Sequence, residues 1–83
     1  MPKKITKDVI IKIIAKILKT TPSKIQKIND LKSVKEWDSL AHLDILSEMD
    51  KKLGNKLSNI KNISNVTNIK KLINILKKKS LLK

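Results

Sequence analysis

The sequence predicts a small all-α domain, and three observations lead to this prediction. The chain has 83 residues, which is the length of one small domain. Apolar residues recur with the spacing of a helix face in three separate stretches. One Gly, two Pro, one Trp and no Phe or Tyr leave few of the turn and aromatic residues that a β-sandwich needs. We therefore expect a single domain, residues 1–83, with a core of Ile, Leu and Val.

The first helix is expected over residues 7–19. Thr6 is placed to cap it, and Ile5 and Ile10 have the spacing of a hydrophobic staple. The apolar positions with helical spacing are Val9, Ile10, Ile13, Ile14, Ile17 and Leu18. Charged residues interrupt this segment, so we expect neither a secretory leader nor a membrane span there. We expect a cytoplasmic protein.

A long connection, residues 20–38, follows the first helix. Its segment Thr21-Pro22-Ser23 can open one short turn, with Pro22 at the first position. The apolar residues that would fasten the connection to the bundle are Ile25, Ile28, Leu31 and Val34. Loops of this length inside a small domain are often functional.

The second helix is expected over residues 39–53, with Gly54 supplying a left-handed stop. Its expected buried face consists of Leu40, Leu43, Leu46, Met49 and Leu53. Leu57, Ile60 and Ile63 then indicate a short third helix or turn.

A final helix is expected after Asn65, which is placed to cap it. Its buried stripe would be Val66, Ile69, Leu72, Ile73 and Leu76. Lys77 to Lys79 fall in the last turn, where positive charge suits the helix dipole, and residues 80–83 are expected to fray. The predicted architecture is therefore a small helical bundle of three long helices and one short helix.

The segment Glu36-Trp37-Asp38-Ser39-Leu40 places a serine hydroxyl where the second long helix begins. It resembles the Asp-Ser-Leu signature of acyl carrier proteins, the phosphopantetheine-binding carrier family. The resemblance covers nearly the whole chain in length and helix order, and its specific part is residues 37–53. It implies that Ser39 is esterified by 4′-phosphopantetheine from coenzyme A, with Asp38 and Leu40 completing the cofactor-binding motif.

The resemblance also implies a function. The chain would not be an enzyme but would shuttle thioester-linked acyl groups between enzymes of lipid or secondary-metabolite biosynthesis. Its partners would be a phosphopantetheinyl transferase and the enzymes that load and transfer acyl groups. An aminoacyl or D-alanyl carrier protein is the alternative within the family.

The chemistry of the residues agrees with an anchor at Ser39. A phosphodiester at a helix N-terminus meets unpaired backbone N–H groups and the positive end of the helix dipole. The chain has no Cys, so a thiol can come only from a prosthetic group, and disulfides and thiolate metal sites are excluded. The alternative is that Ser39 is simply the N-cap of the helix.

His42 and Trp37 each have a competing interpretation. With Ser39 and Asp44, His42 suggests a hydrolase, but His42 and Asp44 are two residues apart on a helix and point in different directions. A lone histidine is also a poor metal site, so we expect His42 at the surface or boundary beside the arm. Trp37 is expected to be a partly buried packing residue, with a ligand platform as the alternative.

The charge distribution departs from that of typical fatty-acid carriers, which are acidic throughout. The net charge here is +13, yet residues 30–50 hold six of the seven carboxylates and only two lysines. That segment carries −4 and the remainder +17. We expect Asp38, Asp44 and Glu48 to dock basic patches on partner enzymes.

The lysine surplus allows a function of a different class, a Lys-rich helical module that binds nucleic acid or membrane. All 20 basic residues are Lys, and specific base recognition depends largely on Arg. We therefore expect no specific nucleic-acid binding, no membrane insertion and a monomer, with Lys filling solvated faces.

Overall fold

The computed structural model describes residues 4–83, which form α-helices and short 3₁₀ turns without a strand in that range. The α-helices are α1 (Lys7–Ile17), α2 (Pro22–Lys27), α3 (Ser39–Lys52) and α4 (Ile69–Lys78). The 3₁₀ turns are η1 (Leu31–Ser33), η2 (Leu57–Asn59) and η3 (Ile63–Asn65). The predicted all-α bundle of three long helices and one short helix is confirmed. No helix within residues 4–83 has the length and apolar character needed to span a bilayer.

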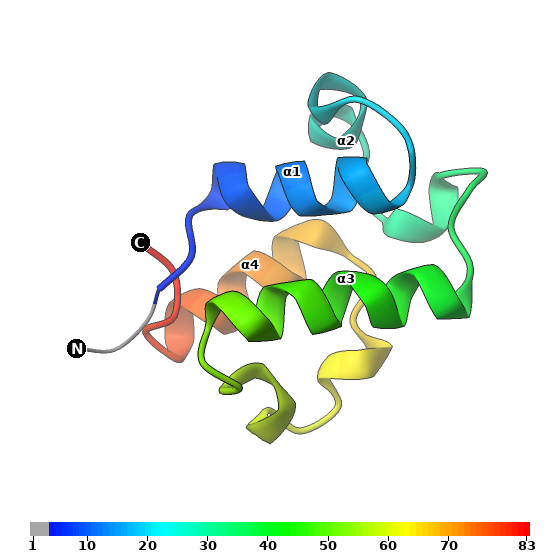
Figure 1. The fold of residues 1–83 in the computed structure, drawn as a ribbon. Helices are drawn as coiled ribbons and strands as arrows, with labels where there is room; N and C mark the ends of the chain where they lie inside the picture. The colour runs from blue at the N-terminus through cyan, green and yellow to red at the C-terminus, as the bar shows by residue number, and fades with distance from the viewer. Residues whose placement is uncertain (1–3) are drawn as a thin grey trace.

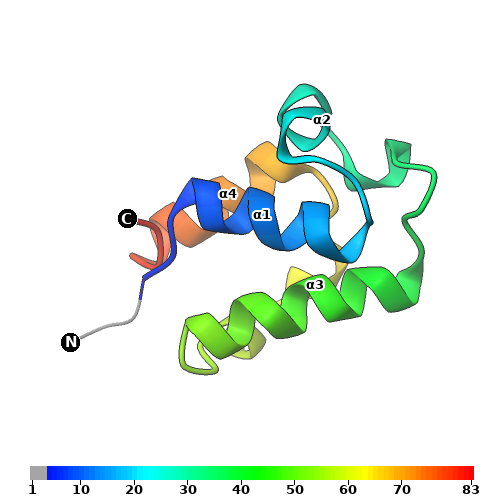
Figure 2. The ribbon, with the colours of Figure 1, turned by 45° about the horizontal axis from the view of Figure 1, so that its top comes forward.

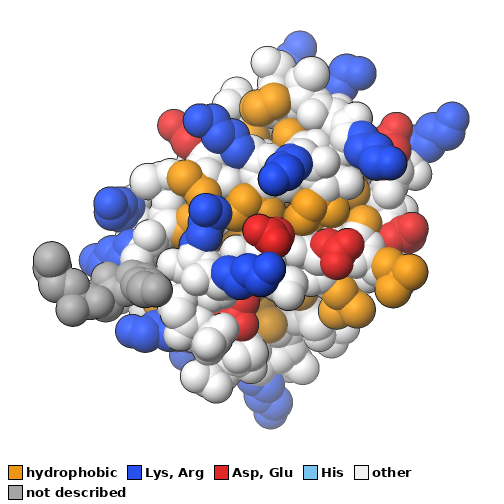
Figure 3. Space-filling model, in the orientation of Figure 1, with side chains coloured by type: hydrophobic (Ala, Val, Ile, Leu, Met, Phe, Trp, Pro, Cys, Tyr) orange, Lys and Arg blue, Asp and Glu red, His pale blue; other side chains and the backbone are white. Residues whose placement is uncertain are grey.

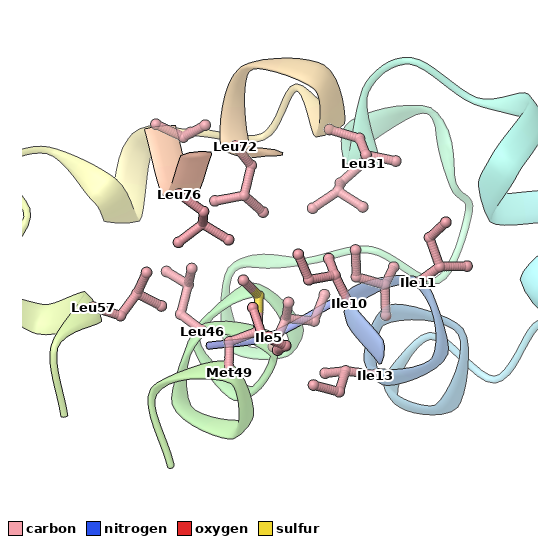
Figure 4. Packing of buried hydrophobic residues seen from close by; sticks show 14 of the residues in the cluster. Ile5, Ile10, Ile11, Ile13, Leu31, Leu46, Met49, Leu57, Leu72 and Leu76 are labelled. Atoms are coloured by element: carbon pink, nitrogen blue, oxygen red, sulfur yellow. The ribbon is translucent and has the colours of Figure 1, made fainter. Parts of the chain in front are cut away.

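The three long helices pack around one apolar core. α1 and α3 run side by side in opposite directions, and α4 lies behind them and runs in the direction of α3 (Figures 1 and 2). Figure 4 shows side chains from these helices and from the 57–65 segment pointing toward one another. The largest fully buried side chains are Ile10, Ile14, Leu18, Ile25, Leu31, Ile45, Met49, Leu53, Leu57, Leu72 and Leu76.

The first part of the chain follows the predictions closely. The Val9 backbone N–H donates to the Thr6 hydroxyl at 3.1 Å, so Thr6 caps α1 as predicted. α1 ends at Ile17, two residues earlier than expected, and Lys19 then adopts a left-handed conformation. The turn at Pro22 continues as the six-residue helix α2, which is longer than the single turn that the sequence predicts.

The connection between α1 and α3 is fastened to the start of α4. The Leu31 N–H donates to the Thr67 carbonyl, and the Ile69 N–H donates to the Asn29 carbonyl, both at 2.9 Å. The Thr67 hydroxyl adds a bond to the Asp30 carboxylate at 3.2 Å. These contacts join segments far apart in sequence, and they hold the chain that leads into α3.

α3 begins at Ser39 as predicted, but the expected buried face is wrong in its first two turns. Leu40 is 74% exposed and Leu43 is 55% exposed, whereas His42 and Ile45 are buried. Apolar side chains surround most of this part of the helix, so their spacing alone does not determine which side faces the core. From Leu46 onward the buried residues are the predicted ones. Gly54, with a φ of 66°, supplies the left-handed stop.

The C-terminal part differs from the predictions at three points. Residues 57–65, where a short helix or turn was expected, form two 3₁₀ turns, η2 and η3, and the short α-helix of the bundle is α2 instead. Asn68, not Asn65, caps α4 by accepting the Lys71 N–H at 3.0 Å, because Asn65 still belongs to η3. The predicted apolar stripe of α4 is buried, except that Ile73 is only partly so.

The expected fraying of residues 80–83 is also wrong. Leu81 is buried, and its carbonyl accepts the Ile5 N–H at 2.8 Å. The Lys83 N–H donates to the Ile5 carbonyl at 3.0 Å. The two ends of the described chain therefore lie together, as Figure 1 shows.

Candidate functional site

The candidate site is the N-terminus of α3. Asp38 adopts an extended conformation and occupies the N-cap position, where its carboxylate accepts the Ala41 N–H at 2.7 Å. Its carbonyl accepts the His42 N–H at 2.9 Å. Ser39 is therefore the first residue inside the helix. The alternative that Ser39 itself is the N-cap is wrong, because Asp38 supplies the cap.

Ser39 is exposed and lies at the edge of a hollow of about 290 Å³. Within residues 4–83, its hydroxyl makes no side-chain hydrogen bond, since the cap contact belongs to Asp38. The lining residues come from the loop before α3, the first turns of α3 and the end of η3: Lys32, Trp37, Ser39, His42, Leu43, Ser64, Asn65 and Thr67. The hydroxyl is thus free for chemistry at a helix N-terminus.

The hollow at Ser39 adjoins a second one of about 480 Å³ that runs along α3. Leu43 and Ser64 line both hollows, so the two are neighbours. Leu46, Ile60 and Ile63 supply apolar surface in the second hollow, which reaches Asp50. At 1.5 Å per residue, α3 rises about 16 Å between Ser39 and Asp50. An extended group attached at Ser39 therefore has a partly apolar groove along which it can lie.

His42 lies inside the protein rather than at its surface, which corrects the expectation from sequence. Its side chain is only 4% exposed. Burial lowers the pKa of His42 below its ordinary value, because the charged form loses its hydration. The nearby Ser64 backbone and Asp30 raise the pKa by smaller amounts, and Lys32 lowers it further. The ring is therefore neutral at pH 7.

Trp37 packs on His42. The indole Nε1–H donates to His42 Nδ1 over a long 3.5 Å contact, and the ring centroids are 5.7 Å apart at an interplanar angle of 56°. Trp37 is partly buried against the core, which agrees with its expected packing role. Sequence reasoning did not detect this pairing, although the spacing of five residues across a helix start allows it.

The arrangement contains no hydrolytic triad. Asp44 is exposed and makes no hydrogen bond to His42 within the described part of the chain. The His42 Nδ1 that a triad carboxylate would orient instead accepts from Trp37. Residues 4–83 also hold no group of three His, Cys, Asp or Glu side chains suited to a metal ion. The site offers an exposed serine hydroxyl and a groove.

The acidic segment divides into structural and solvent-facing carboxylates. Asp30, Asp38 and Asp50 each accept a backbone N–H at the start of a helix or turn. Asp44 is exposed, and Glu48 is partly exposed and pairs with Lys51 at 3.3 Å. Figure 3 shows acidic side chains along α3 with lysines around them. Of the three predicted docking residues, Asp38 therefore also caps α3, a role that the sequence pattern does not predict.

The lysines are spread over the surface. Every lysine from Lys4 to Lys83 is exposed, and within that range the pair between Lys51 and Glu48 is the only ion pair. A larger hollow of about 590 Å³ lies between α1 and α3, with Lys12 and Lys16 on one side and Asp44 and Glu48 on the other. It does not include Ser39.

Comparison of the chain with known protein families, with curated proteins and with solved structures finds no match.

Proposed function

We propose that this chain is a carrier protein that bears 4′-phosphopantetheine on Ser39. The observation that carries the proposal is the geometry at the start of α3. Ser39 is exposed at the first helical position, and Asp38 performs the capping that would otherwise occupy the serine hydroxyl. Within the Asp-Ser-Leu segment, the residue that family resemblance marks for modification is thus accessible to a modifying enzyme.

Favourable and unfavourable charges both act on a phosphodiester at Ser39. The positive end of the α3 dipole and the first backbone N–H groups favour an anion at this position. The Asp38 carboxylate opposes it, since it already occupies one of these N–H groups. Lys32 lines the same hollow and places a positive charge there. If the arm extends toward solvent, its phosphate lies beside these groups and stays hydrated.

The groove along α3 supports the second half of the proposal. Phosphopantetheine supplies a terminal thiol, which this chain without cysteine lacks, and the thiol would hold an acyl or aminoacyl group as a thioester. Leu43, Leu46 and Ile63 offer apolar surface to the arm or its cargo. A tethered cargo meets each partner enzyme at a high effective concentration.

The exposed leucines and carboxylates of α3 form the proposed docking surface. Leu40 and Leu43 are the exposed large apolar side chains of the described chain, and Asp44 and Glu48 follow them on the same helix. An apolar contact supplies affinity, while carboxylates steer a basic partner toward it. A phosphopantetheinyl transferase is the first partner that this surface must recognise.

The test of the proposal is the intact mass after incubation with coenzyme A and a broad-specificity phosphopantetheinyl transferase. We expect the wild-type chain to gain one phosphopantetheine, and Ser39→Ala to gain none. Ser47→Ala, which changes an exposed serine on the same helix, is the control and should be modified fully. Failure of the wild type with several transferases would contradict the carrier function.

Docking has a separate prediction. Asp44→Lys should slow modification of Ser39, and added salt should slow the wild type, because the encounter is steered by charge. Asp8→Lys changes the net charge by the same amount on the exposed surface of α1, and should leave the rate near that of the wild type. Circular dichroism checks that both variants keep their helices. Equal rates for the two variants would place partner recognition elsewhere.

A further inference from the structure

We propose that Trp37 and His42 form a latch that positions Ser39 for modification, and that this latch is closed only while the His42 ring is neutral. The inference rests on the proposed function of Ser39 and adds to it a control of that site. It assigns a role to the one buried polar side chain in the described core, which the anchor itself does not use.

The latch encloses the Asp38-Ser39 segment. Trp37 precedes the N-cap, and His42 lies one turn into α3, so their contact at 3.5 Å ties the loop to the helix on either side of Ser39. The backbone of Trp37 is also held, because its N–H donates to the Val34 carbonyl at 3.0 Å. With both ends of the segment fixed, Asp38 can cap α3 and Ser39 can face the hollow.

The direction of the hydrogen bond determines the state of the ring. Indole Nε1–H can only donate, so His42 Nδ1 must accept and the proton of the neutral ring lies on Nε2. Within residues 4–83, Nε2 is buried and has no hydrogen-bond partner, and the Ser64 backbone lies near the ring. Protonation would place an N–H on Nδ1, directly facing the indole N–H. The contact that closes the latch would then be lost.

The charged groups that face His42 are Asp30, from the connection before η1, and Lys32, from η1 itself. Asp30 is held in place by the Lys32 N–H and the Thr67 hydroxyl, so its carboxylate is fixed rather than free to approach the ring. Lys32 opposes a positive ring. Neither residue provides a direct ion pair for a protonated His42, so the charged ring is released from its buried position instead of being stabilised there.

The direct measurement uses the indole N–H resonance of Trp37, the only tryptophan in the chain. We expect this resonance to move toward the position of a solvent-exposed indole as the pH falls from about 7.5 to about 4, with a midpoint below the ordinary histidine value of about 6.5. The His42→Gln variant, which keeps an acceptor but cannot titrate, should show no such transition. A wild-type resonance that stays constant over this range would overturn the latch.

The functional measurement mixes wild type and His42→Gln as competing substrates in one reaction, so that the pH dependence of the transferase cancels. Mass spectrometry then reads the modified fraction of each. We expect the rate of the wild type relative to His42→Gln to be near one at about pH 7.5. This ratio should fall by roughly two- to tenfold at a pH below the midpoint of the Trp37 transition, because one neutral hydrogen bond is lost. His42→Leu, which lacks an acceptor, should be slower than His42→Gln by a similar factor at both pH values.

The outcomes separate this inference from the carrier function. Efficient modification of Ser39 with a ratio that does not change with pH would overturn the latch and leave the carrier function intact. Absence of modification in all three proteins would contradict the carrier function, and the positioning role with it. Should His42→Leu fail to fold, the wild-type resonance and the competition with His42→Gln still decide the matter.

Discussion

α1 and α3 are antiparallel neighbours, but they follow the hydrophobic pattern to different degrees. On α1, the apolar residues with helical spacing are all buried or partly buried, and lysines occupy the exposed side. On the first two turns of α3, Leu40 and Leu43 face solvent and His42 lies inside. The rest of α3 returns to the ordinary pattern at Leu46 and Met49.

This difference agrees with the proposal that the start of α3 has a task besides packing, while α1 packs against the core. Natural sequences break local rules mainly at functional sites, where the stability lost is recovered elsewhere. Here the departures are exposed leucines, a buried histidine and a serine released from capping, and all lie within four residues of Ser39. The largest departures from the folding pattern therefore coincide with the proposed attachment site.

The largest expected effect separates the two faces of α3. Ile45→Ala should destabilise the protein by about 2–5 kcal/mol, because it opens a cavity at a fully buried position. Leu43→Ala, two residues earlier, should change stability by no more than about 0.5 kcal/mol, since this side chain is exposed. Urea unfolding of both variants measures the contrast. Equal losses would mean that Leu43 packs in the core and that the face assignment is wrong.

A smaller effect distinguishes the cap from the anchor. Asp38→Ala should cost about 0.5–2 kcal/mol of stability, the usual range for loss of an N-cap. Ser39→Ala should cost less, because the Ser39 side chain caps nothing and Ala is a good helix former. Thermal unfolding of the two variants gives the order. A greater loss of stability for Ser39→Ala than for Asp38→Ala would mean that Ser39 is the N-cap.

The effect of pH on stability is expected to be the smallest of the three. Burial lowers the pKa of folded His42 below the unfolded value of about 6.5. The stability contributed by neutral His42 is therefore fully present above about pH 6.5, and is lost as the pH falls from there toward the folded pKa. Relative to His42→Gln, the wild type should lose stability across this window in urea unfolding. Parallel pH curves for the two proteins would contradict the burial of a neutral ring.

The sequence predicts the helices well because their start and stop signals are local. Thr6, Pro22 and Gly54 each act within one turn of chain, and the structure uses all three as expected. The tail was mispredicted because Leu81 is held by Ile5 from the opposite end of the chain, a contact that no local pattern contains. Asn65 was mispredicted as a cap because η3 extends through it, and Asn68 offers the same side chain one turn later.

The candidate site was predicted only in part, for a related reason. The position of Ser39 at a helix start follows from local spacing. The buried side of that helix does not, because Leu40, Leu43 and Ile45 would each suit a core. The choice between them depends on how α3 packs against α1 and against η2 and η3, which are tertiary contacts. The lone histidine after a tryptophan was the one signal in the sequence that could have indicated the buried pair.

The most direct test of the account is the position of the modification within α3. Cleavage after Lys35 and Lys51 releases residues 36–51, which contain two serines, Ser39 and Ser47. Both serines are exposed on the same helix, and only Ser39 lies at its N-terminus beside the exposed leucines. After incubation with coenzyme A and a phosphopantetheinyl transferase, fragmentation of this peptide should place a single phosphopantetheine entirely on Ser39. A modified Ser47, a modified serine outside this peptide, or an unmodified peptide would contradict the assignment of the α3 N-terminus as the functional site.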